Sequence, residues 1–328
     1  MRVLFVGGTG IISSACSELA LERGIELYLL CRGRSPRSVP KGAKVLEGDI
    51  RDPKSARKAL GDLEFDAVAD FISFVPDHIQ VCRELFAGRT RQFLFISSAS
   101  AYKKPVDNWP LTESTPLHNP WWEYSRNKIA CEELLIRAYR ESGFPATIVR
   151  PSHTYDKTLL PLDPYQCGYT VLQRIKQGKP VILHGDGTSL WVLTHHRDFA
   201  KGFVGLLGNP KAIGEAFHIT SDEVLTWNEI IGAIARAAGC QPHIVHVPSA
   251  IIAKEHPGWG AGLLGDKTHS VIFDNTKIKR FVPGFTCTIP FAQGAQEIVD
   301  FYAANPKFEP INAEVDQLMD RLAERFKV

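Results

Sequence analysis

The stretch Val3-Leu4-Phe5-Val6-Gly7-Gly8-Thr9-Gly10-Ile11-Ile12-Ser13 decides the fold of this chain. An apolar run of strand length leads directly into a glycine-rich turn, and a helical pattern follows. Glycine lets the backbone approach a pyrophosphate closely, and the N–H groups and dipole at the start of a helix favour its negative charge. The stretch therefore predicts a strand, a phosphate-binding turn and the start of a helix.

Further strands are expected near residues 25–30, 44–46, 67–71, 92–96 and 146–150, alternating with helical segments. This order predicts an α/β fold, a Rossmann-type doubly wound parallel sheet built from residues 1–160 and a return segment at about 191–222. The proline-rich Leu160-Pro161-Leu162-Asp163-Pro164 marks the departure into a smaller, mostly C-terminal substrate-binding region, residues 161–190 and 223–328. That region has an expected strand and turn at 178–187 and an expected helix from Thr226 to Ala238.

Tyr124 and Lys128 lie four residues apart in an expected helix. Its predicted N-cap is Asn119, Pro120 takes the first helical position, and Ser142-Gly143 ends it. Side chains at this spacing share one helix face and can meet one substrate. A free tyrosine titrates near pH ~10, and a neighbouring ammonium stabilises the phenolate. The pair predicts a catalytic base, and a plain solvated helix face is the alternative.

Several further segments complete a resemblance to the extended short-chain dehydrogenase/reductases, in particular the NAD-dependent epimerase/dehydratase family of sugar-modifying enzymes. The segments are 48–52, 93–102, 149–151, 185–187, 214–220 and 225–229. Together with the glycine turn and the Tyr-Lys pair they cover nearly the whole chain, which looks like a divergent member of that family.

The resemblance implies an NAD(P)-dependent oxidoreductase or epimerase that acts on a secondary hydroxyl of a carbohydrate-like substrate. Tyr124 would move the hydroxyl proton, Lys128 would lower the pKa of Tyr124 and hold the nicotinamide ribose, and the nicotinamide would carry the hydride. Ser98 is implied as the third catalytic residue, with Ser97 and Ser100 as less favoured substitutes. Ala99 and Ser100 stand where sugar-nucleotide dehydratases carry an Asp-Glu pair, which argues against a dehydratase. Epimerase and dehydrogenase both stay open.

The cofactor choice depends on the end of the second strand, where an acidic residue would bind the ribose hydroxyls of NAD. Arg32 and Arg34 stand there instead, and guanidinium groups suit a phosphate, so NADP is the preferred cofactor. NAD above a solvated basic loop is the alternative. Ser13 replaces a family glycine; we expect simple tolerance, or else a hydroxyl that reaches the pyrophosphate. The other implied cofactor-binding residues are Gly7, Gly8, Thr9, Gly10, Ile11, Ile12, Asp49, Ile50, Phe71, Tyr124, Lys128 and Pro151.

The substrate side departs from relatives that bind nucleotide diphosphate sugars. The arginine that follows their Gly-Asp-Gly turn is Trp191 here, and the asparagine of their Arg-x-x-Asn segment is His153. We therefore expect a free sugar, sugar acid or polyol, bound by Ser98, Ser100, His153 and Trp191. Plain packing of Trp191 and a hydrogen-bonded wall at His153 are the alternatives. A nucleotide-diphosphate-sugar 4-epimerase also stays open, with Lys267, Arg174 or Lys176 as diphosphate partners.

A different class of function is a non-catalytic nucleotide- or RNA-binding protein. Residues 191–200 are also similar to a divergent branch of this fold that includes chloroplast stem-loop RNA-binding proteins. Lys and Arg total 38 against 36 Asp and Glu, a net charge of +2 that offers no dedicated surface for a polyanion. Because Tyr124 and Lys128 are retained, we expect an enzyme and no nucleic-acid partner.

The remaining features predict a cytoplasmic homodimer without metal. We find no leader and no apolar run of membrane-spanning length, so no membrane association is expected. The apolar residues Ile129, Leu134, Leu135 and Ala138 give the Tyr124 helix enough surface for a dimer interface as well as a core face. His195-His196 and His243-Ile244-Val245-His246 lack zinc-site spacing. The cysteines 16, 31, 82, 131, 167, 240 and 287 are expected to be reduced packing residues.

Overall fold

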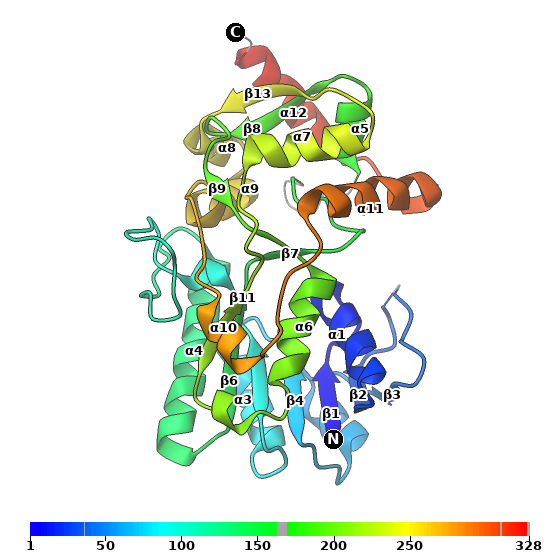
Figure 1. The fold of residues 1–328 in the computed structure, drawn as a ribbon, viewed down its shortest axis with the longest axis vertical. Helices are drawn as coiled ribbons and strands as arrows, with labels where there is room; N and C mark the ends of the chain where they lie inside the picture. The colour runs from blue at the N-terminus through cyan, green and yellow to red at the C-terminus, as the bar shows by residue number, and fades with distance from the viewer. Residues whose placement is uncertain (36, 163–168, 309, 327–328) are drawn as a thin grey trace.

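A seven-stranded parallel sheet forms the larger part of the molecule (Figure 1). The computed structural model describes residues 1–35, 37–162, 169–308 and 310–326. The strand order is β11-β6-β5-β4-β1-β2-β3, and every neighbouring pair is parallel. The predicted doubly wound parallel sheet is confirmed. Its strands are β1 (Arg2–Val6), β2 (Glu26–Cys31), β3 (Lys44–Glu47), β4 (Ala67–Asp70), β5 (Phe93–Ile96), β6 (Ala146–Pro151) and β11 (Ala216–Ile219).

Helices cover both faces of this sheet, which explains why its strands are continuous apolar runs. Along β1, Val3 and Phe5 pack with α1 (Ile11–Glu22) and α6 (His196–Leu206), whereas Leu4 and Val6 face the other way. On that second face lie α2 (Pro53–Leu60), α3 (Pro76–Phe86) and α4 (Glu123–Ser142). The alternation of side chains along each strand therefore serves two cores.

Helix α4 begins later than the sequence predicts. Trp122, not Asn119, is its N-cap, and the helix starts at Glu123. The Asn119 side chain instead accepts a hydrogen bond from the Trp122 N–H at 3.1 Å and donates to the carbonyls of Ser100 and Gly265 at 2.9 and 2.6 Å. Asn119 thus joins three segments in front of the helix. The predicted end is confirmed, since Gly143 is the left-handed C-cap with φ +66°.

The surfaces of α4 are divided between its own core and the exterior. Leu135 and Ala138 are buried against the sheet, whereas Ile129 and Leu134 are only partly buried. A dimer interface on this helix stays a prediction.

A smaller region with its own hydrophobic core lies beyond the carboxyl ends of the strands. Its central pair of strands is β8 (Pro180–His184) with β13 (His243–Val247). Two further short strand pairs lie between this pair and the sheet in the chain order: β7 (His153–Tyr155) with β10 (Leu193–His195), and β9 (Leu190–Trp191) with β12 (Leu225–Thr226). Its helices are α5 (Thr170–Lys176), α7 (Trp227–Ala237), α8 (Ser249–Glu255), α9 (Pro257–Gly262), the π-helical turn η3 (Leu263–Lys267), α11 (Phe291–Ala304) and α12 (Ala313–Arg325). The predicted strand at 178–187 and the helix from Thr226 to Ala238 correspond to β8 and α7.

One segment lies on the other side of the predicted division. Helix α10 (Thr276–Phe281) packs against α6 and β11, and Ile278 and Phe285 enter the sheet core beside Phe203 and Phe217. These apolar side chains cover the edge of the sheet at β11, so residues near 276–285 belong with the dinucleotide side and not with the substrate-binding region. The other predicted boundaries stay predictions. Asp163 and Pro164 of the predicted departure segment, and Cys167, lie outside the described residues.

Three chemical features of the described residues bear on function. The six cysteines among them are free, and Cys16, Cys82 and Cys131 are buried. No group of three or more His, Cys, Asp or Glu side chains within the described ranges is arranged to hold a metal ion. None of the helices in that part of the chain is both long enough and apolar enough to cross a membrane.

Candidate active site

The glycine turn after β1 leaves no room for side chains. Gly7 has φ +85°, and a Cβ there would lie 2.3 Å from Ile72 Cγ2. A Cβ on Gly8 would lie 2.4 Å from Leu29 Cδ2. The Ser13 hydroxyl donates to the Gly7 carbonyl at 2.6 Å and accepts the Gly10 N–H at 2.7 Å. Ser13 therefore braces the turn from within, and its hydroxyl is already used rather than free to reach a pyrophosphate.

A cavity of about 550 Å³ opens at the carboxyl ends of the central strands, next to this turn. In doubly wound sheets ligands bind at this place, where the strand order reverses. We call it the catalytic cavity. It brings together twelve of the predicted site residues: Gly7, Gly10, Ile11, Ile12, Phe71, Ser98, Ser100, Tyr124, Lys128, Pro151, His153 and Trp191.

The other predicted cofactor residues do not line this cavity. Gly8 and Thr9 lie within the turn itself. Arg32 and Arg34 are exposed, and the Arg32 guanidinium lies 3.8 Å from an Asp49 carboxylate oxygen. Ile50 is 5% exposed and packs in the sheet core, and its contact with a cofactor stays a prediction. Arg37 reaches the far side of the crevice, where it pairs with Asp156 and hydrogen-bonds Thr158.

Hydroxyl groups hold Ser98 in place. Ser98 caps the short helix η1 (Ala99–Ala101) at the end of β5, and its hydroxyl accepts the Ser100 N–H at 3.2 Å. The Ser98 and Ser100 hydroxyls lie 2.9 Å apart, and Ser125 donates to the Ser100 hydroxyl at 2.7 Å. Ser98 is partly exposed at the cavity, whereas Ser100 and Ser125 are buried. A role for Ser125 was not predicted, although it adjoins Tyr124 in the sequence.

Ser97 also lines the catalytic cavity, but its hydroxyl belongs to a different network. Its hydroxyl donates to the buried Glu132 carboxylate of α4. Glu132 in turn binds Arg150 of β6 through a bifurcated contact and a hydrogen bond of 2.6 Å, and both side chains are buried. This network joins β5, α4 and β6 directly behind the site.

Tyr124 is a protonated phenol at neutral pH in this structure. Burial raises the pKa of Tyr124 to about 12, a hydrogen bond with Ser98 lowers it, and the nearby Asp266 carboxylate raises it further. The predicted lowering of the Tyr124 pKa by Lys128 is therefore not what the structure gives, because desolvation outweighs the favourable contacts.

Lys128 is bound by backbone carbonyls. Its ammonium donates to the carbonyls of Ser73 and Ile96, both at 2.7 Å, and lies 5.8 Å from the centroid of the Tyr124 ring. Burial lowers the pKa of Lys128 to about 8, and the charge of Asp70 opposes this shift. An ammonium has three donors, so one remains for a ligand in the cavity.

The opposite wall of the catalytic cavity is aromatic. Trp191 is 3% exposed, and its indole N–H donates to His153 Nδ1 at 3.2 Å. The Trp191 ring packs against Trp227 with centroids 5.2 Å apart. Burial lowers the pKa of His153 to about 3, and the charge of Lys267 lowers it as well. Trp191 therefore packs in the wall and fixes His153, and its contact with a substrate stays a prediction.

Three charged residues line the cavity without having been predicted as a group. The buried Lys104 forms an ion pair of 3.4 Å with the partly buried Asp266, and the Lys267 ammonium lies 5.4 and 5.9 Å from the ring centroids of Trp122 and Trp191. Of these three, only Lys267 was named from the sequence, as a possible diphosphate partner of a nucleotide-sugar epimerase. No spacing rule connects residue 104 with residues 266 and 267, because the fold alone brings these loops together.

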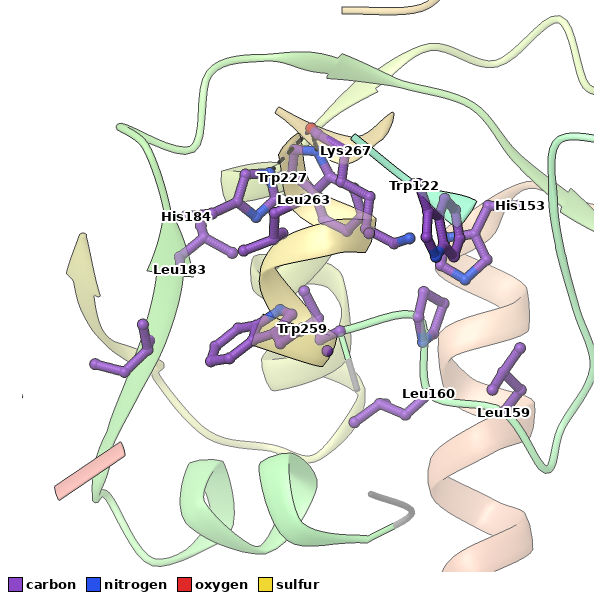
Figure 2. Close-up of a pocket in the computed structure, with 15 residues that line it drawn as sticks. Trp122, His153, Leu159, Leu160, Leu183, His184, Trp227, Trp259, Leu263 and Lys267 are labelled. Carbon is purple, nitrogen blue, oxygen red and sulfur yellow. Dashed lines mark hydrogen bonds between the residues drawn. The ribbon is translucent and has the colours of Figure 1, made fainter. Parts of the chain in front are cut away.

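A second cavity of about 510 Å³, which we call the distal chamber, adjoins the first (Figure 2). Its walls are mostly apolar and include Leu160, Leu162, Leu183, Trp227, Trp259 and Leu263. Trp122, His153 and Lys267 line both cavities. In Figure 2 the Lys267 side chain extends toward Trp122 and His153 at one side of the chamber.

Comparisons with known proteins agree with the fold described above. A family model described as the NAD dependent epimerase/dehydratase family matches residues 3–220 of the 328. A chloroplast stem-loop binding protein of 41 kDa from Arabidopsis thaliana is 28% identical over 75% of this chain and 65% of its own length, just under two thirds. A 2'-dehydrokanamycin reductase from Streptomyces kanamyceticus is 27% identical over 78% of this chain and 72% of its own. A UDP-glucose 4-epimerase from Lactobacillus helveticus is 32% identical over 46% and 51%.

Solved structures show the same fold. A dTDP-glucose 4,6-dehydratase from Bacillus anthracis in complex with NAD superposes with a TM-score of 0.75 and 18% identity, covering 94% of this chain and 98% of the other. A UDP-glucose 4-epimerase from Thermus thermophilus in complex with NAD gives a TM-score of 0.71 and 22% identity, covering 92% and 99%. With the glycine turn, the Tyr-Lys helix and the matched family model, the chain belongs to the NAD dependent epimerase/dehydratase family of enzymes.

Proposed function

We propose that this enzyme interconverts a secondary alcohol and a ketone on a carbohydrate-like molecule that carries no nucleotide diphosphate. The observation that carries the proposal is the composition of one cavity: Ser98, Tyr124 and Lys128 stand on the sheet side, and an aromatic wall stands where a diphosphate would need cations. A substrate without a nucleotide diphosphate would separate this enzyme from the sugar-nucleotide enzymes of the family.

The residues at the glycine turn fit a nicotinamide dinucleotide. Side chains are sterically excluded at Gly7 and Gly8, and the first amides of α1 lack intrahelical partners, as at every helix start. Gly7, Gly10, Ile11 and Ile12 would hold the pyrophosphate, and Phe71, Pro151 and Lys128 would contact the nicotinamide half. The cofactor supplies or accepts the hydride. NADP is the preferred form in this proposal, on the strength of Arg32 and Arg34.

The protein's own part is to move a proton at the substrate oxygen. In the direction of reduction the Tyr124 phenol, protonated because its pKa is raised to about 12, donates its proton to the carbonyl oxygen. Ser98, fixed by Ser100 and Ser125, hydrogen-bonds the same oxygen. Lys128 is positioned by two carbonyls and holds the ribose with its remaining donor. In the direction of oxidation Tyr124 takes the proton back.

Counting cations supports a substrate without a diphosphate. Among the described residues that line the two cavities, the cations are Lys104, Lys128 and Lys267. Lys104 pairs with Asp266, and Lys128 is bound by carbonyls. A diphosphate taken from water without enough partners loses hydration at a cost of at least a few kcal/mol. Arg174 and Lys176, the other candidate partners, line neither cavity; Arg174 is paired with Asp316 and Asp320.

One relative supports this proposal, and two others each keep an alternative open. The reductase relative is named for 2'-dehydrokanamycin, and its name mentions no nucleotide. The UDP-glucose 4-epimerase relative keeps a nucleotide-sugar epimerase as the alternative. The stem-loop binding relative keeps RNA binding as the second alternative. The presence of Tyr124 and Lys128 in this chain argues against it.

The test is to follow NADPH and NADH turnover with panels of free sugars, sugar acids and polyols and with the matching keto compounds. Calorimetry with UDP, dTDP and GDP on the cofactor-saturated protein runs in parallel. We expect turnover within the panel and no micromolar nucleotide binding. Micromolar binding of a nucleoside diphosphate in the substrate cavity would overturn the proposal, and salt-dependent retention of RNA without any turnover would support the RNA alternative.

A further inference from the structure

The junction between the catalytic cavity and the distal chamber has a defined composition. Trp122, His153 and Lys267 line both cavities, so any ligand that extends from Tyr124 into the distal chamber passes these three side chains. Beyond them the chamber is lined by leucine and tryptophan. The space available to a substrate is thus bipartite, with a polar end at Ser98 and Tyr124 and an apolar end at Trp259.

The junction has an excess of one positive charge. Lys104 and Lys267 stand against the single carboxylate of Asp266, and Lys104 is the one that pairs with it at 3.4 Å. Within the described part of the chain, no carboxylate lies within ion-pair distance of the Lys267 ammonium, which lies 5.4 and 5.9 Å from the ring centroids of Trp122 and Trp191. Burial lowers the pKa of Lys267, and the charge of Asp266 opposes this shift. On the sheet side, Lys128 is bound by carbonyls and has Asp70 nearby. The charge left for a ligand is that of Lys267.

The backbone of Lys267 is fixed more firmly than its charged end. Its carbonyl accepts hydrogen bonds from His184 Nε2 at 3.0 Å, Trp227 Nε1 at 3.2 Å and Ser189 Oγ at 3.3 Å. Lys267 also ends the π-helical turn η3, a geometry that is frequent at functional sites. Three hydrogen bonds thus fix the backbone of Lys267, while its ammonium has no carboxylate partner among the described residues.

His153 adds a neutral donor beside this charge. Because the Trp191 indole N–H donates to His153 Nδ1, the ring proton lies on Nε2 at the opposite edge. With a pKa near 3 the ring keeps this neutral tautomer at ordinary pH. One ammonium and one N–H donor beside two tryptophan rings match a single oxyanion, since the pair supplies hydrogen bonds to two oxygens and only one charge.

We propose that Lys267 and His153 bind one carboxylate of the substrate, and that the distal chamber takes an apolar or ring-shaped portion of the same molecule. The substrate class is accordingly an acid with a hydroxyl or keto group at one end and an apolar part at the other. This refinement rests on the proposed function, in which Tyr124 acts on that hydroxyl or keto group.

The experiment is calorimetric titration of the cofactor-saturated protein with 2-naphthoate and with its neutral analogue 2-naphthamide. Wild type should bind the acid at least tenfold more tightly than the amide. Lys267→Met should abolish this difference, and Lys254→Met, at an exposed lysine of α8, should keep it. Trp259→Ala should weaken acid and amide by the same factor, because it removes only the apolar contact.

Equal binding of acid and amide by wild type would overturn the inference, and this comparison needs no variant to fold. Survival of the acid preference in Lys267→Met would overturn the assignment to Lys267. Binding of UDP more tightly than naphthoate would overturn the inferred substrate class. Because no turnover is measured, a failure of the proposed function leaves the binding comparison intact. If nicotinamide turnover is present and the acid preference is absent, only the inference fails.

Discussion

The two walls of the catalytic cavity are built on different principles. On the sheet side, Ser98 and Lys128 are held by hydroxyls and carbonyls, and the network of Ser97, Glu132 and Arg150 lies behind them. The opposite wall faces the smaller region, and we call it the cap side. There the rings of Trp122 and Trp191 lie near Lys267, and its ammonium has no carboxylate partner in the described residues. The sheet side is mostly held by protein hydrogen bonds before a ligand binds, with one donor of Lys128 left over, whereas the charge on the cap side is left for the ligand to neutralise.

This difference separates chemistry from selectivity. Proton transfer needs donors and acceptors fixed in advance, so that little reorganisation is required when the substrate reacts. Selectivity for one substrate class depends instead on what the cavity leaves uncompensated, because a ligand without the matching group leaves that group unsatisfied. Variants on the two walls should therefore fail in different ways.

The largest effect is expected at Tyr124. Tyr124→Phe removes the oxygen that transfers the proton and keeps the ring contacts with Trp122 and Phe74. Turnover of a confirmed substrate should fall by about two to four orders of magnitude, with cofactor affinity nearly unchanged. Tyr139→Phe is the matched control, because Tyr139 is an exposed tyrosine of the same helix. More than a tenth of wild-type turnover in Tyr124→Phe would remove Tyr124 from the mechanism.

The network behind the sheet side should dominate stability. Arg150→Met leaves the Glu132 carboxylate buried without its cation, which costs about 3–5 kcal/mol in such pairs. Urea unfolding measures the loss. Arg137→Met, at an exposed arginine of α4, should change the free energy of unfolding by less than about 0.5 kcal/mol.

The double variant Glu132→Met Arg150→Met sharpens this test. Because it removes both buried charges together, it should recover a large part of the loss. If Arg150→Met alone costs under about 1 kcal/mol, the pair is not the framework of the sheet side, and the contrast between the walls loses its basis.

The same division explains what the sequence could predict. The sheet, the glycine turn and the Tyr-Lys pair depend on short-range patterns: alternating apolar faces, a strand followed by glycines, and a spacing of four on one helix. Each of these is a local signal. On the cap-side wall, His153 and Trp191 were expected only through the family resemblance. Their meeting with Trp227 and Lys267 had no local signal, because the four residues come from separate segments.

The errors have the same origin. Asn119 has the residue type of an N-cap, but its side chain is bound by Ser100 and Gly265, the second of which is distant in sequence. The pKa of Tyr124 was expected to fall because of Lys128, yet burial raises it. The extent of this burial cannot be read from the sequence. Ile278 and Phe285 were assigned to the substrate-binding region from the sequence. In the fold they pack in the core of the sheet and cover its edge at β11.

Lys128 should give the sheet side a pH signature. Burial lowers its pKa from 10.5 to about 8, so between these values the unfolded chain carries a proton that the folded chain lacks. The destabilisation is complete below pH 8 and disappears as pH rises through 10.5, so stability rises with pH in this window. The free energy of unfolding should increase by about 3 kcal/mol across it, at about 1.4 kcal/mol for each pH unit.

The measurement is chemical unfolding of wild type and Lys128→Met at several pH values in this window. Lysines elsewhere titrate in both proteins, so the difference between the two slopes isolates position 128. A slope unchanged by Lys128→Met would mean that the ammonium is better solvated than its contacts with Ser73 and Ile96 indicate.

The smallest effect is expected at the outer rim of the sheet side, where the side chains are exposed and the fixed geometry ends. Arg32 and Arg34 lie on the surface after β2, and Asp49 lies 3.8 Å from Arg32 and competes for its charge. A 2′-phosphate bound there should make NADPH about tenfold tighter than NADH, or about 1.4 kcal/mol.

Arg32→Ser and Arg34→Ser should each remove part of this preference and leave NADH affinity unchanged, whereas Arg23→Ser, at the exposed end of α1, should leave both cofactors unaffected. Asp49→Asn should increase the preference, because it frees Arg32 from its only ion pair in the described residues. Fluorescence titration with both cofactors measures all of these constants, and NADH bound tenfold more tightly than NADPH by wild type would reverse the proposed preference.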